Sequence, residues 1–173
     1  SGSTWSQEAK LLASDKAVGD YFGLSVSVSG DGSRCVIGAY AANPDTISEA
    51  GAAYVFVRSG TDWTQEAKLV ASDKAANDRF GLSVSISGDG SRCVIGSYLA
   101  DPDAISGAGA AYLFVRSDTT WNQEAKLVAS DKAAADSFGR SVSISSDGFR
   151  CVAGSYLADP DSTSGAGAAY IFS

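Results

Sequence analysis

Hydrophobic and polar residues alternate along several short stretches of the chain, as they do in strands with one buried face. In residues 80–87, Phe, Leu, Val and Ile alternate strictly with Gly and Ser. In residues 63–71, the alternation leaves Thr, Glu and Lys on one face, which is typical of a half-solvated outer strand. Residues 92–98 and 110–116 are apolar on both faces and predict central strands. This part of the chain therefore predicts four strands.

A tight turn separates the second and third of these strands. Residues 88–91 read Gly-Asp-Gly-Ser, and all four are turn-forming residues in a short hairpin connection. Residues 72–78 allow one helical turn capped by Ser72 or Asp73, but the segment is too short to form a helix on its own. The pattern therefore predicts an all-β chain.

The same pattern occurs three times, at a spacing of 58 residues. This spacing separates Trp5 from Trp63 and Trp63 from Trp121, and it also separates the three cysteines. The chain divides into the repeats 1–58, 59–116 and 117–173, which we treat as one repeat domain. A fixed period of this length is typical of propellers, solenoids and other arrays, in which each unit buries its hydrophobic face against its neighbours.

Three short strings that contain glycine recur in the same order in every unit. They are Phe22-Gly23, Gly38-Ala39-Tyr40 and Gly51-Ala52-Ala53-Tyr54; Phe80-Gly81, Gly96-Ser97-Tyr98 and Gly109-Ala110-Ala111-Tyr112; and Phe138-Gly139, Gly154-Ser155-Tyr156 and Gly167-Ala168-Ala169-Tyr170. These strings resemble the FG-GAP repeat, although Tyr stands where that family often has Pro. The resemblance covers essentially the whole chain. It implies four-stranded blades arranged radially, as in the integrin α-chain head.

The expected fold class is therefore all-β, a β-propeller-like array of three four-stranded antiparallel blades. A β-trefoil is the alternative, since it also has three four-stranded repeats but closes as a monomer. The longer repeat and the FG-GAP strings count against the trefoil.

The order of strands in each unit predicts open edges. The outer strand comes first, so residues 5–13 are expected to form an edge strand of a blade whose other strands are absent upstream. Residues 138–172 give three strands with no fourth. Three blades are fewer than the usual number of about four to eight in a ring. We therefore expect other copies of the chain to supply the missing strand, which would give a homo-oligomer or a filament.

The hydrophobic faces of the predicted strands define an expected core. It contains Phe80, Val84, Ile86, Cys93, Ile95, Tyr112 and Phe114, together with their counterparts in the other units. Cys35, Cys93 and Cys151 occupy one repeat position, and such positions usually lie farther apart than the distance of about 7 Å that a disulfide spans. We expect them to be small buried hydrophobes, with an intermolecular disulfide or a reactive thiol as the alternative.

The charge pattern excludes some partners. The net charge is −7 and the 13 basic residues are scattered, which argues against nucleic acid. No apolar run approaches the length of about 18 residues that spans a membrane, so no membrane insertion is expected. The first residues do not predict a signal peptide, and the lack of Met indicates a processed product or a piece of a longer protein. We expect an extracellular or cell-surface location.

Neither a metal site nor a catalytic site is predicted. Many members of the FG-GAP family carry a calcium loop of the Asp-x-Asp-x-Asp-Gly type, and calcium takes about six to eight oxygen ligands. Here the corresponding connection, residues 30–33, supplies one Asp, so calcium remains possible but no cofactor is predicted. The chain has no His, which removes Ser-His triads, Cys-His dyads and His-ligated metals. We expect that the protein is not an enzyme.

Aspartates gather in two loops of each unit, and a tyrosine lies beside the longer loop. In a meander both loops leave the same end of the sheet, which would ring one face with carboxylates. The candidate binding residues are Asp15, Asp20, Tyr40, Asp45, Asp73, Asp78, Tyr98, Asp101, Asp103, Asp131, Asp136, Tyr156, Asp159 and Asp161. The aspartates suit a cation or a cationic ligand, or they cap the loops as Asx-turns.

These features together favour a non-catalytic structural or adhesion-type binding module that assembles with further copies of itself. The near-identity of the units favours a scaffold, because specialised ligand sites would have driven the copies apart. The alternative is a lectin-like glycan-binding propeller with one shallow site per repeat. In that alternative Tyr40, Tyr98 and Tyr156 would stack on sugar rings.

Overall fold

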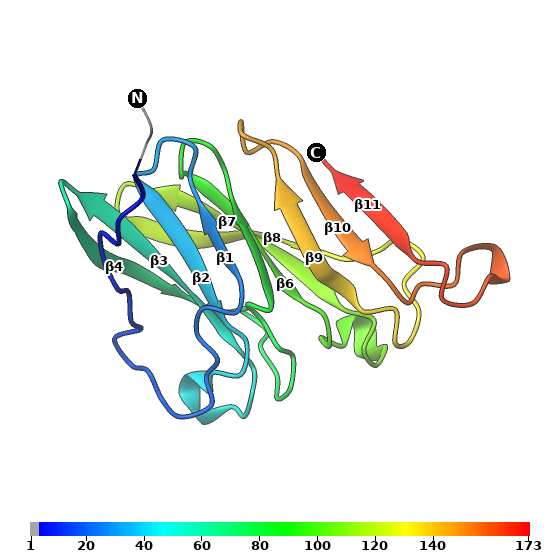
Figure 1. Ribbon diagram of the computed structural model, residues 1–173. Helices are drawn as coiled ribbons and strands as arrows, with labels where there is room; N and C mark the ends of the chain where they lie inside the picture. The colour runs from blue at the N-terminus through cyan, green and yellow to red at the C-terminus, as the bar shows by residue number, and fades with distance from the viewer. Residues whose placement is uncertain (1–3) are drawn as a thin grey trace.

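The computed structural model describes residues 4–173, whose strands form three separate antiparallel sheets placed side by side (Figure 1). The first sheet contains β1 (Val26–Val28), β2 (Arg34–Ala39), β3 (Ala52–Ser59) and β4 (Asp62–Leu69). The second sheet contains β5 (Ser83–Ile86), β6 (Arg92–Ser97), β7 (Ala110–Ser117) and β8 (Thr120–Leu127). The third sheet contains β9 (Phe138–Ile144), β10 (Cys151–Ser155) and β11 (Ala168–Phe172).

Each sheet is a meander, because strands that follow one another in the sequence are neighbours in the sheet. The all-β array of blade-like sheets is therefore confirmed. The β-trefoil alternative is wrong, since a trefoil would join strands from all three repeats into one closed barrel. The strand that opens each unit is the outer strand of the preceding sheet, so β4 and β8 each complete a sheet that began one unit earlier.

Most of the predicted strands appear within a residue or two of their expected bounds, but the second one is shorter. Residues 80–87 were expected to form it, whereas β5 covers Ser83–Ile86. Gly81 has a φ of +92°, which breaks the extended backbone, and Phe80 instead forms an isolated parallel bridge with Gly51 of the first sheet. The predicted strand therefore also serves as a link between two sheets.

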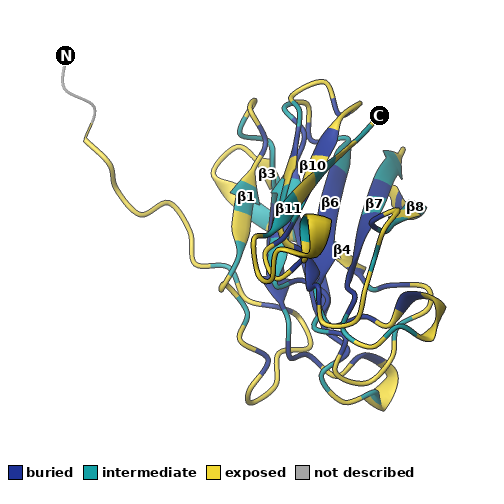
Figure 2. Ribbon diagram, turned by 90° about the vertical axis from the view of Figure 1, so that its right-hand side faces the viewer, coloured by how far each residue is buried: buried dark blue, intermediate teal, exposed yellow. Residues whose placement is uncertain are grey.

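The N-terminal segment differs from its prediction. Residues 5–13 were expected to form an edge strand, but none of the described residues before β1 is in a strand. A strand requires a hydrogen-bonded neighbour, and no described strand lies next to this segment in a sheet. Figure 2 shows the start of this segment as an exposed tail, whereas Ala13 at its end is buried in the core of the first sheet. The third sheet has three strands and no fourth among the described residues, as predicted.

The loops contain turns and three short 3-10 helices. The predicted turn at 88–91 is confirmed, with Asp89 accepting hydrogen bonds from the backbone and side chain of Ser91. Residues 72–78 contain turns and no helix. The 3-10 helices were not predicted, and they are η1 (Pro44–Thr46), η2 (Pro102–Ala104) and η3 (Pro160–Ser162). In residues 4–173, no helix has the length and apolar character needed to cross a membrane.

The repeated glycines allow neighbouring sheets to approach through their backbones. A Cβ atom added to Gly96 of β6 would lie 1.9 Å from the carbonyl oxygen of Gly139 in β9. The same carbonyl accepts a hydrogen bond of 2.8 Å from the hydroxyl of Ser83. Between the first and second sheets, a Cβ atom added to Gly38 would likewise lie 1.8 Å from the carbonyl oxygen of Gly81. The glycines of the FG-GAP-like strings that lie between two sheets, such as Gly38 and Gly96, therefore stand where a side chain does not fit, whereas Gly23 has open space around it.

The core lies between the sheets and is most complete around the second sheet. All seven predicted core residues, Phe80, Val84, Ile86, Cys93, Ile95, Tyr112 and Phe114, are buried. Phe80 makes edge-to-face contacts with Tyr112 and Phe114, at centroid distances of 5.6 and 6.0 Å. The core prediction is confirmed for this sheet.

The same prediction is wrong for part of the first sheet. Val84 of β5 is 9% exposed, whereas its counterpart Val26 of β1 is 66% exposed. Val84 faces the first sheet, but no sheet among the described residues covers the corresponding face of β1. On the third sheet, Val152 and Ile171 are likewise exposed, although their counterparts Val94 and Leu113 are buried or partly buried. The array therefore ends in an apolar face on each side.

Candidate functional site

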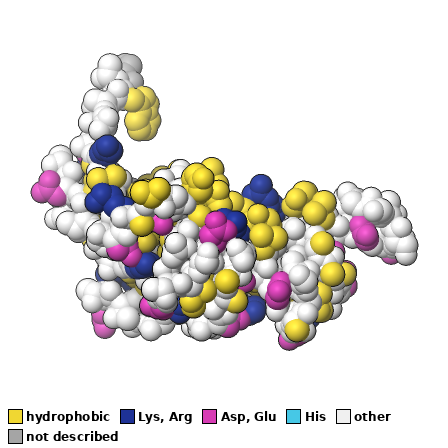
Figure 3. All heavy atoms as spheres, turned by 90° about the horizontal axis from the view of Figure 1, so that it is seen from below, with side chains coloured by type: hydrophobic (Ala, Val, Ile, Leu, Met, Phe, Trp, Pro, Cys, Tyr) yellow, Lys and Arg dark blue, Asp and Glu magenta, His cyan; other side chains and the backbone are white. Residues whose placement is uncertain are grey.

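The acidic loops of each repeat meet at one end of the sheets. A hollow of about 80 Å³ at the first repeat is lined by Asp15, Asp20, Asn43, Tyr54 and Lys68, among others. The third repeat has a hollow of about 70 Å³ at the equivalent place. Figure 3 shows this end of the molecule, where acidic side chains are scattered with basic and hydrophobic ones among them. The predicted meeting of the two loops occurs, but the carboxylates do not form one continuous patch on the face shown.

One loop of each repeat holds a pair of aspartates, which are Asp15 and Asp20, Asp73 and Asp78, and Asp131 and Asp136. In the first two repeats, the first aspartate of the pair bridges two strands of one sheet. Asp73 accepts hydrogen bonds from the hydroxyl of Tyr112, at 2.9 Å, and from Nζ of Lys126, at 2.6 Å. Burial alone would raise the pKa of Asp73, but these two donors outweigh it and lower the pKa. Asp15 makes the same contacts with Tyr54 and Lys68. At Asp131, the position equivalent to Lys126 would belong to a fourth strand of the third sheet.

The second aspartate of each pair caps its own loop. Asp20, Asp78 and Asp136 each accept a hydrogen bond of 2.7 Å from the backbone N–H three residues earlier. Burial raises the pKa of Asp78, against the effect of this hydrogen bond. These contacts fit the interpretation of the aspartates as loop caps, although they are not Asx-turns, because the donor lies before the aspartate in the chain.

The aspartates near the 3-10 helices also have partners within the loops. Asp101 and Asp159 accept hydrogen bonds from the backbone N–H groups of Gly107 and Gly165, at 2.7 and 2.6 Å. Asp45 and Asp103 form exposed ion pairs of 3.1 Å with Lys74 and Lys132. Asp45, Asp103 and Asp161 all have a positive φ between 52° and 54°. Whether any of these residues binds a ligand stays a prediction.

The three candidate tyrosines differ in what covers their rings. Tyr40 stacks on Tyr21 at a centroid distance of 5.3 Å, and the guanidinium of Arg79 lies 5.5 Å from its ring centroid. Arg140 lies 5.2 Å from the ring of Tyr98. Tyr156 is 53% exposed. The tyrosines therefore do not present three equivalent stacking surfaces.

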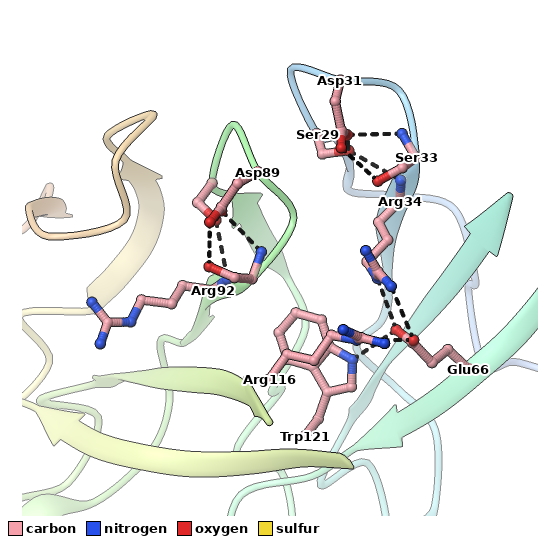
Figure 4. Close-up of polar contacts among 11 residues, drawn as sticks. Ser29, Asp31, Ser33, Arg34, Glu66, Asp89, Arg92, Arg116 and Trp121 are labelled. Atoms are coloured by element: carbon pink, nitrogen blue, oxygen red, sulfur yellow. Dashed lines mark hydrogen bonds and ion pairs between the residues drawn. The ribbon is translucent and has the colours of Figure 1, made fainter. Parts of the chain in front are cut away.

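The hairpin turns hold their aspartates by hydrogen bonds within the turn. Asp31 accepts bonds from the hydroxyl of Ser29 and from the backbone and hydroxyl of Ser33, and these bonds lower its pKa to about 2 (Figure 4). Within residues 4–173, no group of three or more His, Cys, Asp or Glu side chains is placed to hold a metal ion.

Thermal unfolding should therefore be insensitive to calcium. We expect melting curves recorded with a chelator and with millimolar calcium to coincide within a degree or two, because each turn offers one carboxylate and calcium takes about six to eight oxygens. Differential scanning calorimetry of the same preparation under both conditions measures this. A rise of about ten degrees with calcium would show that the acidic loops form sites after all.

A buried carboxylate that the sequence analysis did not single out links the first and second sheets (Figure 4). Glu66 of β4 accepts hydrogen bonds from Arg34 at 3.1 Å, from Arg116 at 3.0 Å and from the indole of Trp121 at 3.0 Å. Its side chain is 8% exposed. Burial would raise the pKa of Glu66, but the three donors lower it. The signal in the sequence was the recurrence of Glu, Arg and Trp at the same repeat positions.

The N-terminal segment makes the same contacts on the first sheet that β4 makes on the second. Glu8, the counterpart of Glu66, accepts hydrogen bonds from Arg58 at 2.7 Å and from the indole of Trp63 at 2.9 Å. The backbone N–H of Ser14 donates to the side chain of Gln65 at 2.9 Å, as Ser72 does to Gln123. The segment therefore lies where the outer strand of a preceding sheet would lie.

The third sheet ends in β11, which among the strands of residues 4–173 pairs with β10 alone. Its counterparts β3 and β7 each pair with an outer strand on the other side, β4 and β8. In the first two sheets, an inner strand pairs with an outer strand that has the sequence pattern of residues 5–13. The edge of β11 offers such an inner strand, and the N-terminal segment offers such an outer strand.

Comparisons with known proteins agree with this architecture. A family model described as the FG-GAP repeat matches residues 5–56, 63–114 and 121–172. No curated protein matches the sequence. Among solved structures, hydrazine synthase from Kuenenia stuttgartiensis is similar with a TM-score of 0.50 at 10% identity. The match covers 86% of this chain and 34% of that protein's chain, so the likeness concerns the fold of about a third of it.

Proposed function

Since this chain belongs to the FG-GAP repeat family, we propose that it is a non-catalytic structural or adhesion-type binding module that assembles with further copies of itself. In this proposal residues 5–13 of one copy pair with β11 of the next and complete its third sheet. The observation that carries it is the position of the N-terminal segment. Its Glu8 already makes the contacts of an outer strand, while β11 has an unpaired edge.

The internal repeats supply the register of this pairing. Val55 pairs with Ala67 in the first sheet, and Leu113 pairs with Ala125 in the second. The same spacing places Ala9 of a second copy opposite Ile171. A strand added to an exposed edge gains a full ladder of backbone hydrogen bonds, which is a recurring way in which proteins associate.

Charged side chains support the same register. The ion pairs of Lys68 with Asp15 and of Lys126 with Asp73 each join an outer strand to an acidic loop. By the same spacing, Lys10 of a second copy meets Asp131. Arg34 and Arg92 contact Glu66 and Glu124 in the outer strands of their own sheets, so Arg150 meets Glu8 of the second copy. In this register, Asp131 and Arg150 of the third sheet each lie beside an opposite charge of the second copy.

The apolar end faces of the array also fit one another. Val84 and Ile86 of the second sheet pack in one core with Val36 and Val55 of the first. Their counterparts Val26 and Val28 are exposed on the first sheet, and the counterparts of Val36 and Val55, which are Val152 and Ile171, are exposed on the third. Contact between copies would cover both faces. Two copies supply six blades, which is within the range of about four to eight found in closed propellers.

The remaining parts of the proposal rest on the family and on the loops. We place the module outside the cell or at its surface, as the resemblance to integrin heads implies. A non-catalytic role is supported by the aspartates of the acidic loops, which cap turns or pair with lysines. The glycan-binding alternative has less support, because Arg79 and Arg140 lie over the rings of Tyr40 and Tyr98.

Deleting residues 1–13 tests the assembly. The intact chain should have the mass of two or more copies by light scattering, and the shortened chain should fall to the mass of one copy or aggregate through its uncovered edge. If the intact chain and the shortened chain both had the mass of one copy and stayed in solution, the proposal would be overturned.

A charge exchange controls for damage to the fold. Lys10→Glu and Asp131→Lys should each weaken assembly, whereas the chain that carries both substitutions should regain it. Each single variant remains folded by circular dichroism if the effect lies between copies. Failure of the double variant to recover would contradict the register.

A further inference from the structure

The third sheet contains an apolar hollow beside the edge of β11. Its volume is about 290 Å³, and its apolar lining includes Leu113, Ala125, Leu127, Ile144, Cys151 and Phe172, with Phe149 at the rim in place of a serine at the preceding junction. The first three residues belong to β7 and β8 of the second sheet, and the others belong to the third. The hollow therefore lies at the junction between two sheets.

At the preceding junction the same position is filled by a tryptophan. Trp121 is 9% exposed and belongs to one core cluster with Val55, Leu69, Ile86, Cys93 and Phe114, which are the counterparts of residues lining the hollow. Its indole N–H donates to Glu66 at 3.0 Å. The counterpart of Glu66 is Glu124, which also lines the hollow. The hollow thus has the apolar walls and the acceptor that hold an indole elsewhere in the molecule.

Trp5 is the tryptophan of the N-terminal segment, and it is 97% exposed. Trp63, one repeat later, is partly buried against the first sheet and donates to Glu8. If residues 5–13 complete the third sheet of a second copy in the register given above, Trp5 reaches the position that Trp121 has on the second sheet. The exposed indole of Trp5 and the apolar hollow then meet.

We propose that this hollow is a socket for Trp5 of a second copy, and that Trp5 is the anchor of the contact between copies. The inference rests on the proposed function, since it requires the N-terminal segment to pair with β11. In the socket the indole lies among Leu127, Ile144 and Phe172, and its N–H donates to Glu124. Buried tryptophans at the centre of protein interfaces carry a large share of the binding energy.

Substitution of Trp5 in the full chain tests the socket. Trp5→Ala should raise the dissociation constant for self-assembly by at least about tenfold, as expected for a buried tryptophan at an interface. Trp5→Phe should weaken assembly less, because the phenyl ring fills the hollow but lacks the N–H for Glu124. Trp5 is exposed in the single chain, so neither change should disturb the fold. Val18→Ala is the matched control, because position 18 is exposed in all three repeats.

A second variant changes the wall of the socket and leaves Trp5 unchanged. Ala125→Trp places an indole in the hollow itself and should block assembly, while circular dichroism reports whether the chain is folded. The difference in fluorescence between the unsubstituted chain and Trp5→Phe gives the emission of Trp5. It should move to shorter wavelengths, and become less accessible to iodide, as the protein concentration rises through the assembly range.

The outcomes separate the socket from the assembly itself. If the unsubstituted chain assembles and Trp5→Ala assembles equally well, with Trp5 still accessible to iodide, the socket is wrong and strand pairing stands. If the unsubstituted chain is monomeric at every concentration, the proposed function fails, and the socket fails with it. Loss of assembly in both Trp5→Ala and folded Ala125→Trp supports the socket.

Discussion

Replacing Phe80 with alanine should lower the free energy of unfolding by about 3–5 kcal/mol, the usual cost of emptying a buried phenylalanine site. Phe80 is fully buried and contacts the rings of Tyr112 and Phe114 edge to face. It also forms the bridge to Gly51 that links the second sheet to the first. The backbones of the first and second sheets already approach closely beside Gly81, so we expect the neighbouring strands to close little over the cavity.

Phe22→Ala is the matched control, because Phe22 has the same repeat position on the first sheet but is only partly buried. Its loss of stability should be clearly smaller. Urea unfolding at one fixed protein concentration measures both variants, since assembly would otherwise make the apparent stability depend on concentration. A cost below about 1 kcal/mol for Phe80→Ala would contradict the packing described here.

The second large effect concerns the contact between the first and second sheets. Glu66→Gln should lower the free energy of unfolding by about 2–4 kcal/mol, because two guanidinium groups and an indole lose a charged acceptor that is shielded from water. Glu124→Gln is the control at the equivalent position when it is measured below the concentration at which copies assemble, because the proposed socket engages Glu124 only in the assembled protein. The side chain of Glu124 is 39% exposed, and within residues 4–173 its ion pair is with Arg92 alone, at 3.3 Å, so its replacement should cost less than about 1 kcal/mol.

Part of the loss of stability at low pH should come from protonation of Glu66. The pKa of Glu66 is lower in the folded protein than its unfolded value of 4.5. Its contribution to stability is therefore complete above pH 4.5 and is lost as the pH falls through the folded pKa. Unfolding curves of Glu66→Gln measured against pH should lack this part of the acid destabilisation. Parallel curves for the variant and the unsubstituted chain would show that Glu66 does not carry it.

The sequence predicted those features that depend on local pattern. Residues 92–98 and 110–116 are apolar on both faces, and they form the central strands β6 and β7. The Gly-Asp-Gly-Ser turns and the core around Phe80 followed from alternation and turn chemistry in the same way. In each case a few neighbouring residues determine the outcome.

Features that depend on a distant partner were not predicted correctly. Val26 and Val84 stand in nearly the same local sequence, but only Val84 is covered by another sheet. Residues 5–13 have the pattern of β4 and β8, yet a strand forms only where a neighbouring strand is present. Each short 3-10 segment contains an aspartate with a non-helical positive φ, at Asp45, Asp103 or Asp161, which the Pro-Asp sequences do not specify.

In the candidate site, too, the sequence predicted the local features and missed the contacts between distant residues. The aspartates were found because they gather in loops, and the meander places those loops at one end. The contacts of Glu66 went unnoticed, because its donors Arg34 and Arg116 lie 32 and 50 residues away in the chain. Only a comparison of all three repeats places Glu, Arg and Trp together.

The pairing of residues 5–13 with β11 of another copy is tested most directly by a disulfide between copies. Ala9→Cys in one population and Ile171→Cys in a second should cross-link when the two are mixed, assembled and mildly oxidised. Residues opposite one another on adjacent strands have Cα atoms about 4.5–5.5 Å apart, which a disulfide spans. The native cysteines should not form disulfides under these conditions, because burial raises the pKa of Cys35 to about 11 and also raises the pKa values of Cys93 and Cys151.

Ser6→Cys is the control for register, because it lies about 10 Å farther along the strand. The proposed pairing predicts a cross-linked product with the mass of two chains for Ala9→Cys mixed with Ile171→Cys, and little product for Ser6→Cys mixed with Ile171→Cys or for any variant alone. Absence of the product between Ala9→Cys and Ile171→Cys, with both chains folded, would contradict it.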